Sequence, residues 1–368
     1  MAPTELHPAP EPTSAGVVAG SDSRRARRLS LGVGLPIMVV AVIVAIVLSV
    51  GIGPVKISPG TTVQIIAHKF FGFGSEQPAL ETSVVMSLRL PRILFGALTG
   101  AALAVSGAVM QSLFRNPLAD PGVIGVSGGA STGAVVAIVL LSSVGAGLYQ
   151  WLVPAAAFCG GLLAVAIIYT LARPGRGYGT SRLLLVGIAV GAGFSAITGF
   201  MTFLADDEKL QSVVFWQMGS LDDIDWTKLA VGAAVVIVCV IVLCLMHRKL
   251  DALTLGERSA YYLGLNVVSV RRWLIILSAL LTSVTVAFAG TIGFVGLVVP
   301  HVVRLLTGPA HRGLLPLSAL TGALLLVVAD TIARSVAPPA EVPIGLLTSA
   351  LGAPFFLFLV LRSREGRP

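Results

Sequence analysis

Charged side chains are scarce in this chain. Asp, Glu, Lys and Arg make up 11% of its 368 residues, whereas 55% are hydrophobic. None of these four residues, and no His, occurs in the 52 residues from Pro121 to Ala172. Such a run excludes a water-soluble domain, and the absence of short alternating segments excludes an outer-membrane barrel. Because a transmembrane helix needs roughly 20 mostly apolar residues, the composition indicates a polytopic helical membrane protein.

Several motifs are also missing. The sequence has no G-x-x-x-x-G-K-[ST] loop, so any ATP must be bound by a partner, and we expect no cofactor in this chain itself. No Ser/His/Asp or paired-carboxylate pattern is evident, so no catalytic residue is predicted and an enzyme is disfavoured. No dense basic and aromatic face accompanies the net charge of +8, which argues against nucleic acid. No metal site is predicted, because the three cysteines lie in apolar runs without C-x-x-C or Cys/His spacing: Cys159, Cys239 and Cys244.

The hydrophobic runs predict an all-α, polytopic membrane protein with about ten transmembrane helices. We expect a disordered cytoplasmic tail over 1–28, a transmembrane domain over 29–361 and a cytoplasmic C-terminal tail over 362–368. The spans are expected near 31–53, 92–113, 122–143, 149–171, 182–204, 228–247, 272–290, 294–306, 314–333 and 343–361.

Basic residues orient these spans. With the N-terminus inside, cytoplasmic segments hold 18 of the 25 Lys and Arg residues, in agreement with the positive-inside rule. Both termini are then cytoplasmic. Glycines four apart predict close helix packing rather than a site; the pairs are Gly96 and Gly100, Gly125 and Gly129, Gly129 and Gly133, and Gly187 and Gly191.

Few charges remain inside the predicted spans. Asp330 and Arg334 are four apart near the outer end of the ninth span, which fits either a helix-end ion pair or a functional role. A lone His301 in the eighth span is read as a satisfied packing residue. A proton-coupled transporter usually carries more buried carboxylates or histidines, which makes a secondary transporter the weaker alternative.

The longest polar loop on the cytoplasmic side runs from His247 to Arg272. Within it, Glu257, Ala260 and Leu263 or Gly264 are three or four residues apart, as on one face of a short helix. Glycines at 256 and 264 bracket this segment and permit sharp turns. From spacing alone this is a solvated loop helix, and it is also the best candidate dock for a partner.

A family resemblance rests on four stretches of the sequence. They are 89–92 with 107–111 and 116–122; 255–264; 290–297 with Pro300 and His301; and 329–334 with 341–345 and 351–354. In this order, over roughly residues 60–361, they resemble the bacterial ABC importer permeases for iron chelates and cobalamin, the FecCD-type family.

The resemblance implies a set of partners. Two permease subunits, identical or related, would form a dimer with the translocation path at its axis. Two ATP-binding subunits, holding ATP and Mg, would bind on the cytoplasmic side, and an extracytoplasmic substrate-binding protein would dock outside. The location would be the bacterial inner membrane. An iron-siderophore chelate is the expected cargo, with haem or cobalamin as the alternative.

The resemblance also implies roles for individual residues. Arg89, Arg92 and Arg334 match outward-facing arginines that dock the binding protein, although interfacial snorkelling would also explain the first two. The residues that match the cytoplasmic gate are Asn116, Leu118, Thr180 and Ser181, of which the last two also suit a helix N-cap. The residues that match the ATPase-coupling segment are Gly256, Glu257, Ala260, Leu263 and Gly264.

Overall fold

The computed structural model describes residues 30–53, 55, 57–73, 77–172, 179–337 and 340–364. Within these ranges every regular element is helical. The elements are α1 (Leu31–Gly51), α2 (Pro59–Phe71), α3 (Ala79–Ser83), a π-helix η1 (Val84–Arg89), α4 (Leu90–Phe114), a 3-10 helix η2 (Pro121–Ile124), α5 (Val126–Leu140), α6 (Ala146–Ala172), α7 (Gly179–Phe203), α8 (Asp207–Met218), α9 (Trp226–Leu245), α10 (His247–Thr254), α11 (Glu257–Tyr262), α12 (Val267–Ala289), α13 (Val295–Thr307), α14 (His311–Ala333) and α15 (Ile344–Arg364).

The all-helical membrane fold predicted from composition is confirmed. Seven helices of the described ranges are long and apolar enough to cross a membrane, and three shorter apolar helices accompany them. In chain order these correspond to the predicted spans, although α5 and α13, with 15 and 13 residues, are shorter than a full crossing. The set is α1, α4, α5, α6, α7, α9, α12, α13, α14 and α15.

Two predicted boundaries were wrong. The second span does not begin at Arg92: α3, η1 and α4 form a continuous helical stretch, Ala79–Phe114, of 36 residues. Its charged residues were expected to mark a helix start, but they are buried beside partners, so the helix passes through them. The C-terminal tail is also shorter than predicted, because α15 extends to Arg364. The predicted tail over 1–28 lies outside the described residues.

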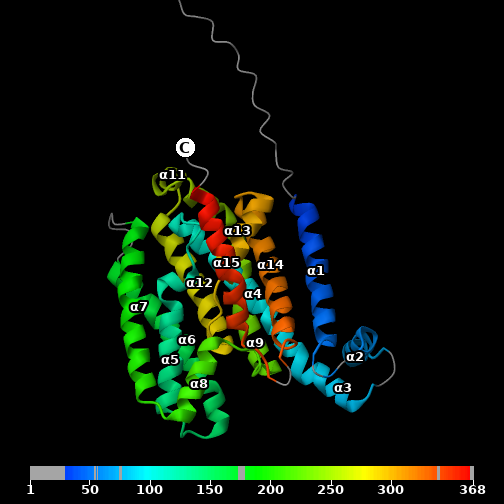
Figure 1. Cartoon of the computed structure of the whole chain (residues 1–368). Helices are drawn as coiled ribbons and strands as arrows, with labels where there is room; N and C mark the ends of the chain where they lie inside the picture. Colours follow the sequence, from blue (N-terminus) through cyan, green and yellow to red (C-terminus); the bar gives the residue numbers. More distant parts are fainter. Residues whose placement is uncertain are drawn as a thin grey trace, which may run out of the picture.

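The helices α4 and α12 occupy the centre of the bundle. In the most apolar 18-residue segment of α4 and its N-terminal extension, 78% of the residues are buried. The corresponding share is 11% in α1 and in α7. α4 contacts α9, α12, α13 and α14, whereas α1 packs mainly on α14 and α7 packs on α5 and α6. Figure 1 shows α1 and α7 on opposite flanks of the bundle. The apolar faces of these two helices therefore remain available to lipid or to a partner.

Glycines allow the central helices to approach closely. A Cβ at Gly100 would overlap the carbonyl of Gly322 in α14, and a Cβ at Gly107 would overlap the carbonyl of Gly296 in α13. The predicted packing role is confirmed for Gly100, and likewise for Gly129 and Gly133 against α6. It is wrong within this chain for Gly191, where a Cβ would meet nothing within 4 Å.

The bundle has two distinct ends (Figure 1). α11 lies at one end together with the start of α1 and the C-terminal part of α15, and we call this the α11 end. The opposite end carries α2, α3 and α8, the start of α4 and the last turn of α14, and we call it the arginine end. Three arginines belong to the arginine end: Arg89 is the last residue of η1, Arg92 lies in the first turn of α4, and Arg334 directly follows α14.

Candidate functional site

A buried charge cluster links α4 to α14 at the arginine end. The Arg92 Nε donates to Asp330 Oδ1 at 2.9 Å, and Arg334 Nε donates to Asp330 Oδ2 at 2.9 Å. Arg92 also pairs with Glu341, at 2.6 Å, and with Asp222. Asp330 is fully buried, and its carboxylate is paired with two guanidinium groups, as burial of a charged group requires. The ion pair expected between Asp330 and Arg334 is confirmed.

The same cluster holds the end of α1. The Arg89 guanidinium donates to the carbonyl oxygens of Val50 at 2.7 Å and Val55 at 2.6 Å. The Arg334 Nη2 donates to the Ser49 Oγ at 2.9 Å. These bonds satisfy carbonyls at a helix end that would otherwise lack partners. α1, α4 and α14 are therefore fastened together by arginine side chains.

The structure brings Arg89, Arg92 and Arg334 to one end, as the sequence predicted. Their side chains, however, do not project into solvent: the residues are 5%, 9% and 3% exposed. Snorkelling toward the interface is therefore wrong as an explanation for Arg89 and Arg92. Sequence reasoning missed the role of Asp222 and Glu341 as partners of Arg92. Their place in polar loops between apolar helices was the available signal.

Asp222 and Glu341 have pKa values that shift in opposite directions. Burial raises the pKa of Glu341, and the neighbouring Asp222 raises it further, against the opposing effect of Arg92. Burial would also raise the pKa of Asp222, but a hydrogen bond from Glu341 and the charge of Arg92 bring it below its usual value. Of the two carboxyl groups, Glu341 therefore takes up a proton at a higher pH than Asp222.

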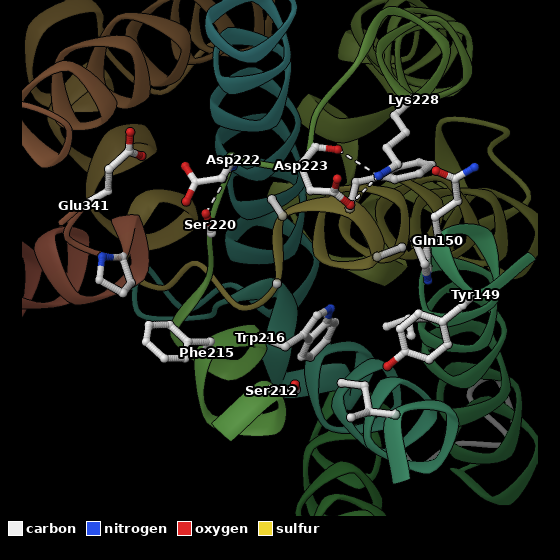
Figure 2. Close-up of a pocket in the computed structure, with 18 of the residues that line it drawn as sticks. Tyr149, Gln150, Ser212, Phe215, Trp216, Ser220, Asp222, Asp223, Lys228 and Glu341 are labelled. Atoms are coloured by element: carbon white, nitrogen blue, oxygen red, sulfur yellow. Dashed lines mark hydrogen bonds and ion pairs between the residues drawn. The ribbon is translucent and has the colours of Figure 1, made fainter. Parts of the chain in front are cut away.

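A cavity of about 770 Å³ opens beside this pair. Figure 2 shows Trp216 and Tyr149 on one part of its wall and Asp222 and Glu341 on another. Lys228 also lines it and is paired with Asp223. The cavity thus combines aromatic surface with largely paired charges, which suits transient contact with a bulky amphipathic molecule. Among the described residues, no three His, Cys, Asp or Glu side chains are grouped as metal ligands.

The predicted loop helix forms at the α11 end. Gly256 precedes it with φ 119° and Gly264 follows it with φ 82°, backbone conformations that favour glycine. Ala260 is fully buried, and Glu257 pairs with the buried Arg271 of α12. These two contacts fix α11 against the bundle. Leu263 is 64% exposed, so the predicted common face is divided between packing and exposure.

An exposed surface surrounds this contact. Tyr261 is 70% exposed and Tyr262 84% exposed, and both line a groove of about 310 Å³ together with Arg258 and Val268. Exposed aromatic side chains beside charged ones are typical of protein interfaces. The α11 end therefore presents a rigidly held surface that suits a protein partner.

The residues predicted to form the gate lie at the α11 end of α4 and α7. The Asn116 Oδ1 accepts a hydrogen bond from the Leu118 N–H at 2.9 Å, which shapes the turn that leads to η2. α7 contacts η2, the short helix that follows the turn of Asn116. α7 begins at Gly179, which puts Thr180 and Ser181 in its first turn rather than at the N-cap. Their side chains lie outside the described part of the chain.

Two histidines differ from expectation. The buried Nδ1 of His301 has no hydrogen-bond partner among the described residues, so the description of a satisfied packing residue was wrong. A Ser/His/Asp arrangement does exist, contrary to expectation: His311 contacts Ser112 and Asp251, each at 2.6 Å. Its members come from α4, α10 and α14, which is why spacing could not reveal it. Ser112 is buried within the bundle, so the arrangement is structural rather than catalytic.

Comparison with known proteins agrees with this architecture. A sequence profile of the FecCD transport family matches residues 41–362. The chain belongs to the FecCD transport family. The resemblance stated from the sequence motifs is thereby confirmed.

Individual relatives extend this FecCD assignment. The hemin transport system permease protein HmuU of Yersinia pestis is 47% identical over 77% of this chain and 84% of its own length. The cobalamin import system permease protein BtuC of Halobacterium salinarum is 44% identical over 84% of this chain and 80% of its own length. Both names describe transport permeases rather than enzymes.

A solved structure supports the FecCD fold. A protein described as a metal-chelate type ABC transporter, in an inward-facing conformation, aligns with a TM-score of 0.78 at 33% identity. The alignment covers 89% of this chain and 98% of that protein. The helix arrangement found here is therefore that of a membrane transport permease.

Proposed function

We propose that this FecCD-family chain is the membrane-spanning subunit of an ATP-driven importer of a metal chelate. The observation that carries the proposal is α11, a short helix held against α12 by Glu257 and Arg271 while its two tyrosines face outward. The chain has no P-loop of its own, so the energy must enter through a surface of this kind.

Two ATP-binding subunits, carrying ATP and Mg, would dock at the α11 end. The Glu257–Arg271 contact fixes the base of α11, and the exposed Tyr261, Tyr262 and Leu263 supply apolar contact area. Closure of the ATPases would then move α11 as a rigid body. This assignment would make the α11 end cytoplasmic, in agreement with its basic residues, and would put both termini on the cytoplasmic side of the bacterial inner membrane.

A substrate-binding protein would dock at the arginine end. Arg92 holds carboxylates of its own chain through Nε, Nη1 and Nη2, so an acidic side chain of the partner would have to exchange with Asp222 or Glu341. Asp222 has a half-exposed side chain, and it is therefore the carboxylate most readily replaced. Docking would in this way alter the contact that links α4 to the loop before α9.

The cytoplasmic gate would form where α4 and α7 approach η2, at Asn116, Leu118, Thr180 and Ser181. A second permease subunit, either a copy of this chain or a related one, would complete the path. The small polar and apolar side chains suit a constriction that opens for a bulky chelate, whereas a ring of charges would select small ions.

The cargo would be a bulky metal chelate. An iron-siderophore complex is the first candidate, as expected from the sequence. Haem is the second, favoured by the 47% identity with the hemin permease over 84% of that protein. Cobalamin is carried by the archaeal relative named above and is the third.

Co-purification and ATPase stimulation test the proposal. The chain, expressed with its neighbouring genes, should retain an ATPase through detergent extraction, and the binding protein should raise that ATPase activity. A panel of labelled ferric siderophores, haem and cobalamin should then identify the chelate that the binding protein delivers. A chain that is purified without an ATPase and transports none of them would contradict the proposal.

A further inference from the structure

A buried hydrogen-bond bridge connects the segment that carries α11 with the last turn of α4. The Asp251 carboxylate of α10 accepts from the His311 backbone N–H at 3.0 Å and contacts its Nδ1 at 2.6 Å. The His311 Nε2 contacts the Ser112 Oγ at 2.6 Å. His311 and Ser112 are 2% and 5% exposed, so water cannot substitute for the bond between them, whereas the Asp251 side chain is 42% exposed.

The bridge lies between two regions with assigned roles. α10 leads directly into α11 through Gly256, and Leu250 and Leu253 pack it against the bundle. Ser112 precedes the turn of Asn116, whose N–H donates to the Gln111 carbonyl at 3.1 Å. A displacement of α10 therefore has a hydrogen-bonded route to the gate turn through His311, beside the direct packing of α10 on α4.

The protonation of the bridge follows from its donors and acceptors. Asp251 is an acceptor, so His311 Nδ1 carries a hydrogen. The Ser112 hydroxyl has one hydrogen, which it can give either to the Ala108 carbonyl at 2.9 Å or to His311 Nε2. In the first case the imidazole is charged and in the second it is neutral, and a rotation of the hydroxyl keeps both contacts. Both contacts of His311 therefore persist in either protonation state, so the link between α10 and α4 does not depend on a change of protonation.

We propose that His311 is a positioning residue that transmits movement of the α10–α11 segment to α4 and its gate turn. The inference rests on the proposed function, because it assigns a route to the ATP-driven movement. Among hydrogen bonds between described residues, those of Asp251 are the ones that join α10 to a helix that is not its neighbour in sequence. The connection is also rigid, because Leu314 and Leu315, which follow His311 in α14, are fully buried.

The two side-chain contacts of His311, with Asp251 and with Ser112, can be removed separately. An asparagine places its amide near the position of Nδ1, so His311→Asn keeps the contact with Asp251 and loses Ser112. A glutamine reaches the position of Nε2, so His311→Gln keeps the contact with Ser112 and loses the side-chain contact with Asp251, while the backbone N–H of residue 311 still donates to that carboxylate. Ser112→Ala removes the contact with α4, and Ser112→Thr keeps the hydroxyl. Ser318→Ala is the matched control, because Ser318 is a fully buried serine of α14 whose hydroxyl has no partner among the described residues.

The experiment measures uptake and ATP hydrolysis by the complete complex in proteoliposomes. Removal of the side-chain contact of His311 with either Asp251 or Ser112 should lower the amount of chelate taken up per ATP hydrolysed by about tenfold. This is the effect expected for loss of a hydrogen bond to a charged group. The rate of ATP hydrolysis in these variants should match that of the unmodified protein. The control variants Ser112→Thr and Ser318→Ala should also keep the unmodified ratio of uptake to ATP hydrolysis. An unchanged ratio in His311→Asn, His311→Gln and Ser112→Ala would overturn the inference.

Hydrogen exchange of the purified chain separates a local role from transmission. His311→Gln should raise amide exchange in 247–254, because the tie between α10 and α14 loses its side-chain contact and keeps only the bond from the backbone N–H of residue 311. Faster exchange together with an unchanged ratio of uptake to ATP would show a local fastening only and would also overturn the inference. If the unmodified complex shows no ATP-dependent uptake, the proposed function fails instead.

Discussion

Arg92 and Asp330 are 238 positions apart in the sequence, and yet the Nε of one and the Oδ1 of the other are 2.9 Å apart inside the bundle. Asp330 also binds Arg334, so a single carboxylate joins α4 to α14. This relationship explains how a chain with so little charge can bury several charged groups at one end.

Asp330→Asn should destabilise the fold. The variant leaves two buried guanidinium groups without their shared carboxylate, and removal of one partner from a buried ion pair costs about 3–5 kcal/mol. Unfolding in mixed detergent micelles should show a loss of about 3 kcal/mol, the lower end of that range, because Arg92 keeps Glu341 and Asp222. Asp207→Asn, on the exposed start of α8, should have little effect. Equal losses in the two variants would contradict this assignment.

Docking of the substrate-binding protein should depend on Arg92 and on Asp222, the carboxylate of the same chain that competes for Arg92. Reversal of Arg89 and Arg92 together to glutamate should weaken binding of the substrate-binding protein and remove ATPase stimulation. Asp222→Asn should strengthen binding by up to about fivefold, because a partly exposed pair contributes 1 kcal/mol or less. Binding to the permease in nanodiscs measures both changes. Asp223→Asn is the control, since Asp223 pairs with Lys228. Unaltered binding after charge reversal would remove the docking role.

Stability at the arginine end should depend on pH through Glu341. Its pKa is raised in the folded state, so its stabilising contribution is complete below the ordinary value of about 4.3 and is lost as pH rises through the folded-state value. Asp222, whose pKa is lowered, contributes above its ordinary value and loses that contribution as pH falls.

Glu341→Gln isolates this effect. Glutamine keeps a hydrogen-bond donor beside Asp222 and cannot ionise. The variant should therefore gain stability relative to the unmodified chain as pH rises above about 5. Unfolding free energies at a series of pH values measure the difference. A difference that does not vary with pH would show that Glu341 does not hold the proton.

Gly107→Ala should disturb the packing of α4 against α13. The added methyl would overlap the Gly296 carbonyl, and overpacking of a tight helix contact costs about 1–3 kcal/mol. Thermal unfolding of the purified permease should show a clear decrease in midpoint. Gly191→Ala adds the same methyl to α7, where nothing lies within 4 Å, and should leave the midpoint unchanged. A similar midpoint for both variants would refute the close-packing interpretation.

Much of the fold was predictable because long apolar runs carry their own signal. The order of the ten apolar helices followed from those runs, and the short α11 followed from Gly256 and Gly264. The extension of α4 back to Ala79 was not predictable, because Arg89 and Arg92 read as a boundary when their partners are unknown. Burial of a charge depends on distant residues, which hydropathy cannot show.

For the candidate site, the sequence predicted only at which end of the bundle each residue lies. The sequence placed the three arginines at one end and Glu257 at the other, and the structure agrees with both placements. It did not reveal that Asp222 and Glu341 hold Arg92, or that His311 joins Asp251 to Ser112. Each of these contacts links residues from different helices, so no local spacing records it.

ATP-dependent uptake tests the central claim most directly. The complete complex should be reconstituted in vesicles with its binding protein and a labelled chelate. Uptake should persist when the proton gradient is dissipated and stop when ATP is depleted. Uptake that stops with the proton gradient and continues without ATP would contradict the account.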